Sequence, residues 1–330
     1  MARVLSGVQP TGDMHLGGYL GAFRHWAVDQ HEHDSFFCVV DLHALTSLID
    51  PAELRARTLE VATILLAVGI DPEVSTLFVQ SHVPAHTELS WLLECTASFG
   101  ELSRMTQFKE KAAGREQVPA GLFTYPALMA ADILAYDSDL VPVGDDQRQH
   151  LELTRDLALR FNHRFGQTFV VPEAAIPKVG ARVMDLQNPA RKMSKSEESP
   201  QGTVLMLDDP AVIRRKIGRA VTDPGSDVIY DPPSKPGVSN LLELLAAATG
   251  RDPVELAAGY DRYATLKADV AEAVVEMLRP VQDRYHQLAA DPGQLSSILE
   301  RGATRAETVA AATYDRARDA MGLLPRRRRP

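Results

Sequence analysis

The chain has 330 residues, of which 45% are hydrophobic and 24% are charged, and its formal net charge is −9. These values are ordinary for a soluble globular protein, and the length suggests two domains. No apolar run approaches the length of a membrane span, and the N-terminal sequence has no signal-peptide pattern. Cys38 and Cys95 form no Cys-x-x-Cys motif, so neither a disulfide framework nor a metal site is indicated. We therefore expect a cytoplasmic protein.

The N-terminal part alternates between apolar runs typical of buried strands and segments whose apolar residues have helical spacing. Strands are predicted at 3–5, 35–40, 77–79 and 140–143. Helices are predicted at 51–68, 87–95, 101–111, 125–136 and 146–160, and another from about Gly18. This alternation predicts an α/β fold, a Rossmann-like doubly wound parallel sheet that binds ligands at the carboxyl ends of its strands.

Beyond Gly202 the pattern is helical throughout. Helices are predicted at 211–220, 241–248, 253–258, 263–289 and 305–321, with a proline- and glycine-rich loop at 223–237. We therefore predict a Rossmann-type catalytic domain over residues 1–200, followed by a mostly α-helical domain over residues 201–330.

A glycine-rich segment follows the first predicted strand and reads Ser6-Gly7-Val8-Gln9-Pro10-Thr11-Gly12-Asp13-Met14-His15-Leu16-Gly17-Gly18. Glycines at a strand-to-helix turn let backbone approach a ligand closely, and the unpaired N–H groups suit phosphate. The segment matches neither the dinucleotide glycine fingerprint nor a Walker loop. An ordinary turn has a similar composition, and His15 is equally compatible with a structural role, so this segment alone leaves the function open.

A second segment, Arg191-Lys192-Met193-Ser194-Lys195-Ser196, combines three cations with two hydroxyl groups. Prolines and glycines on both sides indicate a mobile loop. Lysines on such a loop can close on a triphosphate and offset the charge that develops as pyrophosphate leaves. The alternative is a solvated basic loop, but the first segment favours the phosphate-binding interpretation.

Together and in this order, the two segments resemble the HIGH-type and KMSKS signatures of class I aminoacyl-tRNA synthetases. Between them, Asp146–Asp156 resembles the tryptophanyl and tyrosyl subgroup, and Tyr125–Leu134 resembles its tryptophanyl members. The resemblance implies a ligase that activates L-tryptophan with ATP and transfers it to tRNA(Trp). It also implies that Mg²⁺ is carried on the ATP phosphates.

The ATP site implied by this resemblance combines both signatures with the strand end between them. Its expected residues are Gln9, Pro10, Thr11, His15, Gly17, Gly18, Gly144, Asp145, Asp146, Val183, Lys192, Met193, Ser194, Lys195 and Ser196. By the same resemblance, Gly144, Asp145 and Asp146 contact the ribose and phosphate end of ATP, and Val183 contacts adenine through its backbone.

The implied tryptophan site lies largely on the predicted helix 125–136. Spacings of four and three residues place Tyr125, Met129 and Asp132 near one helix face. A carboxylate among apolar neighbours is costly without a donor, and the indole N–H is only a donor, so Asp132 is expected to select the side chain. Met129 is expected in the pocket wall and Tyr125 at the ammonium group. The remaining expected contacts are Gln147 at the ammonium group, and Gln9 and His43 at the carboxylate and the pocket wall.

Other interpretations exist for these residues taken singly. Without the resemblance, Met129 is a core residue and Asp132 an ordinary half-buried acid. His43 is more often structural.

The reaction implied by the resemblance has two steps. The tryptophan carboxylate attacks the α-phosphorus of ATP, and the resulting adenylate then transfers its acyl group to the terminal ribose of the tRNA. No protein nucleophile is required, because positioning and electrostatics dominate such transfers. The expected catalytic residues are Lys192, Lys195 and Lys111, although an exposed helical lysine is the alternative for Lys111.

The predicted helical domain is expected, by family analogy, to bind the tRNA anticodon and to help form a homodimer. The acidic net charge does not oppose RNA binding, because the position of charges matters more than their sum. Basic residues cluster at Arg214, Arg215, Lys216 and Arg219, and in the terminal run 326–329.

Two residues depart from the family pattern. Gly18 stands where a side chain that forms a hydrogen bond is expected, and Leu5 stands where relatives often have phenylalanine. The alternatives that remain are a tyrosine--tRNA ligase, a small nucleotidylyltransferase and a catalytically idle synthetase-like binding paralogue.

Overall fold

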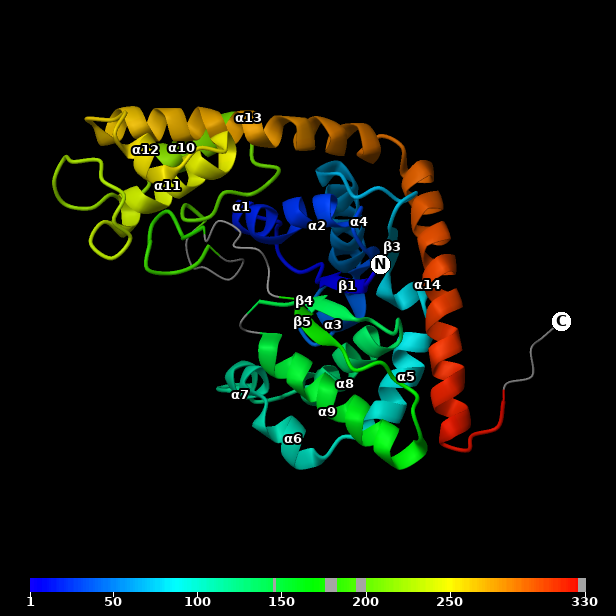
Figure 1. Ribbon diagram of the computed structural model, residues 1–330. Coiled ribbons are helices and arrows are strands. Elements are labelled where there is room, and N and C mark those ends of the chain that lie inside the picture. Colours follow the sequence, from blue (N-terminus) through cyan, green and yellow to red (C-terminus); the bar gives the residue numbers. More distant parts are fainter. Residues whose placement is uncertain (145–146, 176–182, 194–199, 326–330) are drawn as a thin grey trace.

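Five parallel strands form one sheet in the computed structural model, which describes residues 1–144, 147–175, 183–193 and 200–325 (Figure 1). The strand order is β3-β2-β1-β4-β5. The strands are β1 (Arg3–Val8), β2 (Asp34–Val39), β3 (Thr76–Val79), β4 (Leu140–Pro142) and β5 (Glu173–Ala175). The chain first adds strands on one side of β1 and then on the other, so the order reverses between β1 and β4. Sheets of this kind bind ligands beyond the carboxyl ends of the strands at such a switch point.

Helices cover both faces of this sheet. Val39 and Leu77 pack in a core shared with α4, whereas Cys38 and Phe78 pack in a second core shared with α5, α8 and α9. Burial on both faces explains why the strand sequences are continuous apolar runs. The helical segments in this part are α1 (Leu16–Gly18), η1 (Tyr19–Phe23), α2 (Arg24–Asp29), α3 (Asp41–Ala44), α4 (Pro51–Val68), η2 (Gln80–His82), α5 (Ala85–Glu94), α6 (Phe99–Arg104), α7 (Thr106–Ala112), α8 (Ala120–Leu134) and α9 (Arg148–Phe165).

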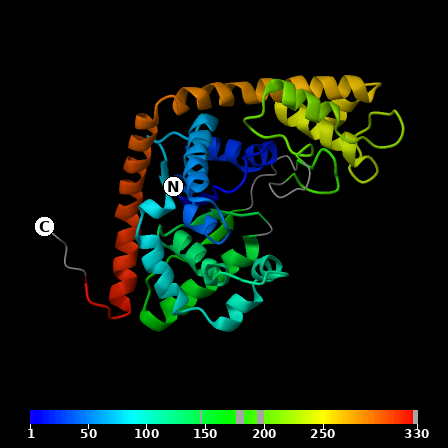
Figure 2. The same cartoon turned by 180° about the vertical axis from the view of Figure 1, so that it is seen from behind.

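The rest of the described chain is helical. Its elements are α10 (Pro210–Gly218), α11 (Pro236–Thr249), α12 (Pro253–Ala257), α13 (Tyr263–Ala289) and α14 (Pro292–Ala320). Helix α13 packs on α10, α11 and α4, and α14 turns back along the sheet to contact β3 and α5 (Figures 1 and 2). The predicted fold class is confirmed, whereas the division at residue 200 stays a prediction. Within the described residues, no helix combines the length and apolar character of a membrane span.

Several predicted element boundaries were wrong. The helix predicted at 305–321 begins at Pro292, where the Asp291 side chain accepts a hydrogen bond from the Gln294 N–H group. The helix predicted at 101–111 is divided into α6 and α7 at Met105, whose backbone leaves the helical region (φ −59°, ψ 123°). Strand β5 was not predicted, because it has only three residues and two of them are exposed.

Helix α14 approaches the edge strand β3 most closely at Gly302. A Cβ atom at this position would overlap the backbone carbonyl group of Leu77. We therefore expect Gly302→Ala to lower the free energy of unfolding by about 1–3 kcal/mol, the usual cost of overpacking. Urea denaturation of the purified protein measures this difference.

The matched control is Gly121→Ala in α8, where nothing lies within 4 Å of the added Cβ atom. Because alanine favours a helix by roughly 0.5–1 kcal/mol relative to glycine, this control is expected to be neutral or stabilising. Equal unfolding free energies for wild type and Gly302→Ala would contradict the packing of α14 on β3.

Candidate active site

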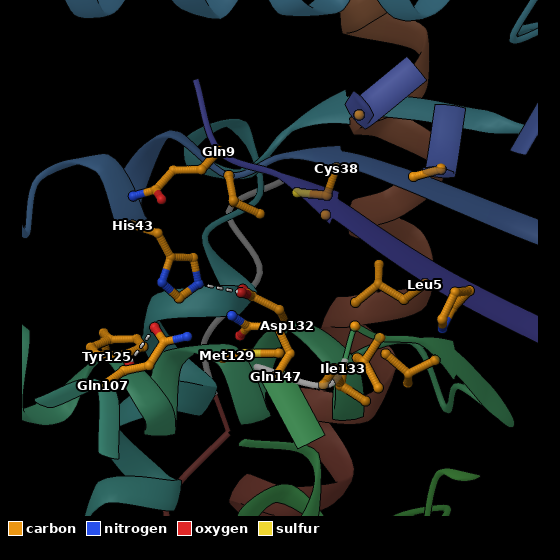
Figure 3. Close-up of a pocket in the computed structure, with 18 of the residues that line it drawn as sticks. Leu5, Gln9, Cys38, His43, Gln107, Tyr125, Met129, Asp132, Ile133 and Gln147 are labelled. Carbon is orange, nitrogen blue, oxygen red and sulfur yellow. Dashed lines mark hydrogen bonds and ion pairs between the residues drawn. The ribbon is translucent and has the colours of Figure 1, made fainter. Parts of the chain in front are cut away.

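A pocket of about 420 Å³ lies at the switch point between β1 and β4 (Figure 3). Residues from β1 and β2, from α3 and α8, and from the loop after β4 line it. All six residues predicted at the tryptophan site are among them: Gln9, His43, Tyr125, Met129, Asp132 and Gln147. The structure thus brings together residues that are up to 138 positions apart in the sequence (147 − 9).

Asp132 is the most constrained polar residue of the pocket. Its side chain is buried, with a residue exposure of 4%. The carboxylate oxygen Oδ2 lies 2.7 Å from His43 Nε2, and Figure 3 shows these two groups facing each other. Oδ1 accepts a hydrogen bond from Gln80 Nε2 at 2.7 Å and lies 2.6 Å from His86 Nδ1.

These donors decide the charge of Asp132. Burial by itself raises the pKa of this carboxyl, but the charges and hydrogen bonds of His43 and His86 outweigh burial and hold its pKa below the usual range. Asp132 is therefore ionised and can only accept hydrogen bonds. In the structure the partners of this buried acid are three side chains of the protein itself, and its contact with an indole N–H stays a prediction.

Sequence reasoning missed Gln80 and His86. Both follow the carboxyl end of β3, Gln80 in η2 and His86 in the first turn of α5. They lie 52 and 46 positions from Asp132 in the sequence, and no motif links them to it. The available signal was weak: they are polar residues directly after a buried strand whose carboxyl end faces the ligand edge of the sheet.

Tyr125 lies on α8 with Asp132, and its ring centre is 6.2 Å from that of His43. Its hydroxyl group lies 2.7 Å from His150 Nε2, and burial raises the pKa of Tyr125 to about 12. Lys111 Nζ lies 5.6 Å from the centre of the Tyr125 ring, within cation–π range. The phenol therefore stays protonated at neutral pH, and Lys111 brings a positive charge to the pocket wall.

The two signature segments contact each other. Leu16 N–H donates to the Val204 carbonyl at 2.8 Å, and His15 forms an isolated antiparallel bridge with Leu205. A Cβ atom on Gly17 would lie 3.4 Å from Met193 Cβ. The first segment therefore contacts the second signature at Met193 and the residues that follow it at Val204 and Leu205.

The described part of the second signature is anchored by its own backbone. Met193 N–H donates to the Val183 carbonyl at 3.0 Å, and Met184 forms an antiparallel bridge with Lys192. Val183 and Met193 are buried, whereas Lys192 is exposed. Five predicted ATP-site residues lie outside the described residues: Asp145, Asp146, Ser194, Lys195 and Ser196.

Of the predicted ATP-site residues, Gln9, Gly18 and Gly144 line the pocket. Pro10 and Thr11 follow the end of β1. His15 Nδ1 accepts a hydrogen bond from the Gly18 N–H at 3.2 Å, which caps α1.

The two departures from the family pattern occupy ordinary positions. Gly18 has right-handed helical backbone (φ −69°, ψ −41°), so a residue with a side chain needs no unusual angle there. A Cβ atom on Gly18 would lie 3.3 Å from Phe23 Cε2. Leu5 lines the pocket, as expected for a wall residue.

Comparison with known proteins decides the family. The family described as "tRNA synthetases class I (W and Y)" matches residues 1–279. This chain belongs to that family. The resemblance inferred from the two signatures is thereby confirmed, and the protein is a member of an ATP-using class of synthetases.

Individual relatives are similar over nearly the whole chain. The chain is 59% identical to tryptophan--tRNA ligase 1 of Streptomyces coelicolor, with 98% of each chain covered. It resembles a crystal structure of tryptophanyl-tRNA synthetase from Mycoplasma pneumoniae with a TM-score of 0.91, 36% identity and 98% of each chain covered. The enzyme of Campylobacter jejuni, solved with ADP and tryptophan, gives a TM-score of 0.85 and 34% identity, covering 97% of this chain and 100% of that chain.

The close approach of Gly17 to the His15 ring gives a testable variant. A Cβ atom at Gly17 would lie 3.1 Å from His15 Nδ1 and 3.3 Å from His15 Cε1, closer than ordinary contact, so Gly17→Ala must displace the His15 ring. We expect this variant to lose about tenfold or more in kcat/KM for ATP, equivalent to ~1.4 kcal/mol. Amino-acid-dependent ATP–pyrophosphate exchange measures the loss.

The neighbouring variant Gly18→Ala is the control, because its Cβ atom would meet only the Phe23 and His15 rings, at 3.3 Å or more. It is expected to stay within about threefold of wild type, since a small shift of Phe23 relieves the contact. Equal losses for the two variants would show that the position of the His15 ring has no importance for catalysis.

Proposed function

We propose that this protein is a tryptophan--tRNA ligase, which activates L-tryptophan with ATP to tryptophanyl-adenylate and transfers it to tRNA(Trp). The observation that carries the proposal is the ionised Asp132 carboxylate in the pocket at the switch point. An ionised carboxylate accepts hydrogen bonds and cannot donate them. It therefore fits a substrate group that donates, such as the indole N–H, and not a substrate group that only accepts. The 59% identity with a curated tryptophan--tRNA ligase supports the same substrate.

The side chain of tryptophan is recognised by the inner part of the pocket. Asp132 accepts the indole N–H, while Met129 and Leu5 contact the apolar ring. Tyr125 and Gln147 contact the ammonium group, and Gln9 with His43 orients the carboxylate. These assignments are supported by the common location of these residues on the pocket wall.

ATP lies across the mouth of the pocket, between the two signatures. The turn from Gln9 through Thr11 and the helix start at His15, Gly17 and Gly18 face its phosphates, and Gly144, Asp145 and Asp146 contact the ribose and phosphate end. Val183 contacts adenine through its backbone, and Met193, Ser194 and Ser196 complete the phosphate side.

Lys111, Lys192 and Lys195 are the catalytic residues of this proposal. They stabilise the charge that develops on the departing pyrophosphate, and each such contact contributes roughly 3 kcal/mol to transition-state stabilisation. The protein supplies no nucleophile: the tryptophan carboxylate attacks the α-phosphorus in line, and the α–β phosphoanhydride bond breaks.

Mg²⁺ enters with ATP in this proposal. Among the described residues that line the pocket, the carboxylate is that of Asp132, which His43, Gln80 and His86 already hold, and the other charged side chain is the cation Lys111. These side chains fit an ion that is held by the phosphate oxygens of ATP, as Mg²⁺ commonly is. When bound, the ion would offset the negative charge of the phosphates.

The acceptor substrate is tRNA(Trp). The adenylate transfers its acyl group to a ribose hydroxyl at the tRNA terminus, and AMP leaves. Residues 1–200 form the catalytic domain, and residues 201–330 contribute the anticodon-binding surface. We further propose that the protein acts as a homodimer in the cytoplasm.

Aromatic amino acids can be compared directly in ATP–pyrophosphate exchange. Tryptophan-dependent exchange supports the proposal, exchange only with tyrosine supports a tyrosine--tRNA ligase, and no exchange with any amino acid supports an idle paralogue. The assay needs no tRNA, so it tests activation separately from transfer.

The substrate assignment depends on Asp132. Asp132→Asn keeps the shape of the side chain but removes its charge and replaces one acceptor oxygen by an NH₂ donor. This new donor would face the side chains that donate to Asp132 in wild type. We expect tryptophan activation to fall by two or more orders of magnitude, equivalent to ~3 kcal/mol. Any residual activation of phenylalanine, which offers no donor, should fall much less. The exchange assay with both amino acids measures the two losses.

The control is Asp137→Asn, the same substitution at a residue that pairs with Arg316 at the surface. Exposed ion pairs contribute little to the stability of a fold, so this variant should activate tryptophan at the wild-type rate. If Asp132→Asn lost tryptophan and phenylalanine activation equally, Asp132 would have a structural role only and the tyrosyl alternative would regain support.

A further inference from the structure

His86 connects the pocket acid to a residue outside the pocket. His86 is fully buried, with Nδ1 at 2.6 Å from Asp132 Oδ1 and Nε2 at 2.7 Å from the Tyr136 hydroxyl group. Neither His86 nor Tyr136 is among the residues that line the pocket. The three side chains thus form a buried chain that starts at the pocket and ends in the core.

Tyr136 holds the far end of this chain in place. It is fully buried, and its ring packs against Phe36 and Phe78 with centroid distances of 4.8 and 5.5 Å. The Tyr136 carbonyl also accepts a hydrogen bond from Arg3 Nη1 at 2.9 Å. Ring packing and a backbone anchor leave the hydroxyl group in one position, so it presents a fixed partner to His86.

Hydrogen-bond roles along the chain follow from the charge on Asp132. An ionised carboxylate only accepts, so His86 Nδ1 carries the proton of this contact. The other ring nitrogen of His86, Nε2, lies 2.7 Å from the Tyr136 hydroxyl group, so the ring is held at both ends. Burial raises the pKa of Tyr136 well above its ordinary value, so this hydroxyl keeps its proton. Tyr136 therefore holds the His86 ring in the orientation that donates to Asp132.

The two oxygens of Asp132 are held unequally. Oδ1 is fixed by His86 and Gln80, whereas among the described residues Oδ2 has only His43 as a partner. A carboxylate oxygen accepts two hydrogen bonds. Fixing Oδ1 from the core therefore aims Oδ2 at the pocket with capacity for one more donor.

We propose that His86 and Tyr136 are positioning residues for tryptophan recognition: Tyr136 anchors His86 Nε2, and His86 holds Asp132 Oδ1 so that Oδ2 meets the indole N–H. This inference rests on the proposed function and extends it to two residues that do not touch the substrate. Without the Tyr136 hydroxyl, the His86 ring loses its partner at Nε2 and can turn away from Asp132, which misplaces the acceptor.

The test compares Tyr136→Phe with Ser138→Ala. Both variants delete one buried hydroxyl from the segment that follows α8, but Ser138 Oγ forms no hydrogen bond and has no link to Asp132. ATP–pyrophosphate exchange gives the KM for tryptophan and for ATP separately. We expect Tyr136→Phe to raise the KM for tryptophan about tenfold, as loss of one buried hydrogen bond implies, with the KM for ATP within about twofold. Ser138→Ala should leave both unchanged.

A double-mutant cycle tests whether Tyr136 acts through His86. His86→Asn keeps an amide N–H near the position of Nδ1 but cannot reach Tyr136, so it should retain more tryptophan affinity than His86→Leu. In the His86→Asn background, Tyr136→Phe should change the KM for tryptophan by less than about twofold, because coupled residues are non-additive. A purely structural hydroxyl would give the same fold-change in both backgrounds.

Equal KM values for Tyr136→Phe and Ser138→Ala would overturn the inference, as would equal increases in the KM for tryptophan and for ATP. Additive effects in the His86→Asn background would overturn it as well. If wild type showed no tryptophan-dependent exchange, the proposed function would fail and this inference with it. If wild type showed tryptophan-dependent exchange and Tyr136→Phe left the KM for tryptophan unchanged, only the inference would be overturned.

Discussion

The cost of removing the Asp132 carboxylate from water is the constraint on which the site depends. A buried charge is tolerated only when donors surround it, and removing one partner of such a group typically costs about 3–5 kcal/mol. Here the donors come from α3, from the turn after β3 and from the start of α5, through His43, Gln80 and His86. The hydrogen bonds of the carboxylate therefore fix how these three elements pack on α8. That packing determines the shape of the pocket.

The topology of the sheet determines where the pocket that contains this carboxylate lies. Because strand order reverses between β1 and β4, the loops that follow them diverge and leave the pocket beyond their carboxyl ends. The glycine-rich segment begins within β1, and its Gly17 approaches Met193 of the second signature. The sites proposed for the amino acid and for the phosphates are therefore adjacent, although their residues come from distant parts of the sequence.

Much of the fold and of the pocket could be predicted, because short motifs and the spacing of apolar residues indicate them within one segment of the sequence. Helix α4 was predicted with its observed bounds from the spacing of its apolar residues and from Pro51 at its start. In the structure Asp50 caps it and Gly69 ends it at φ 117°. The six predicted tryptophan-site residues line the pocket because their motifs fall on strand ends and on one face of α8. Gln80, His86 and Tyr136 could not be predicted, since their importance arises only when tertiary packing brings them to Asp132. Strand β5 was too short and too exposed to give a pattern.

In the proposed function the buried carboxylate of Asp132 accepts the indole N–H, and an analogue that lacks this one donor separates that contact from the shape of the ring. In 3-benzothienyl-L-alanine a sulfur atom replaces the N–H group within nearly the same ring shape. ATP–pyrophosphate exchange with wild-type protein should give a kcat/KM for this analogue roughly 10²-fold below that for tryptophan, because Asp132 then has an unmet acceptor. Values for the two amino acids within about threefold of each other would contradict the account, since shape alone would then explain selection.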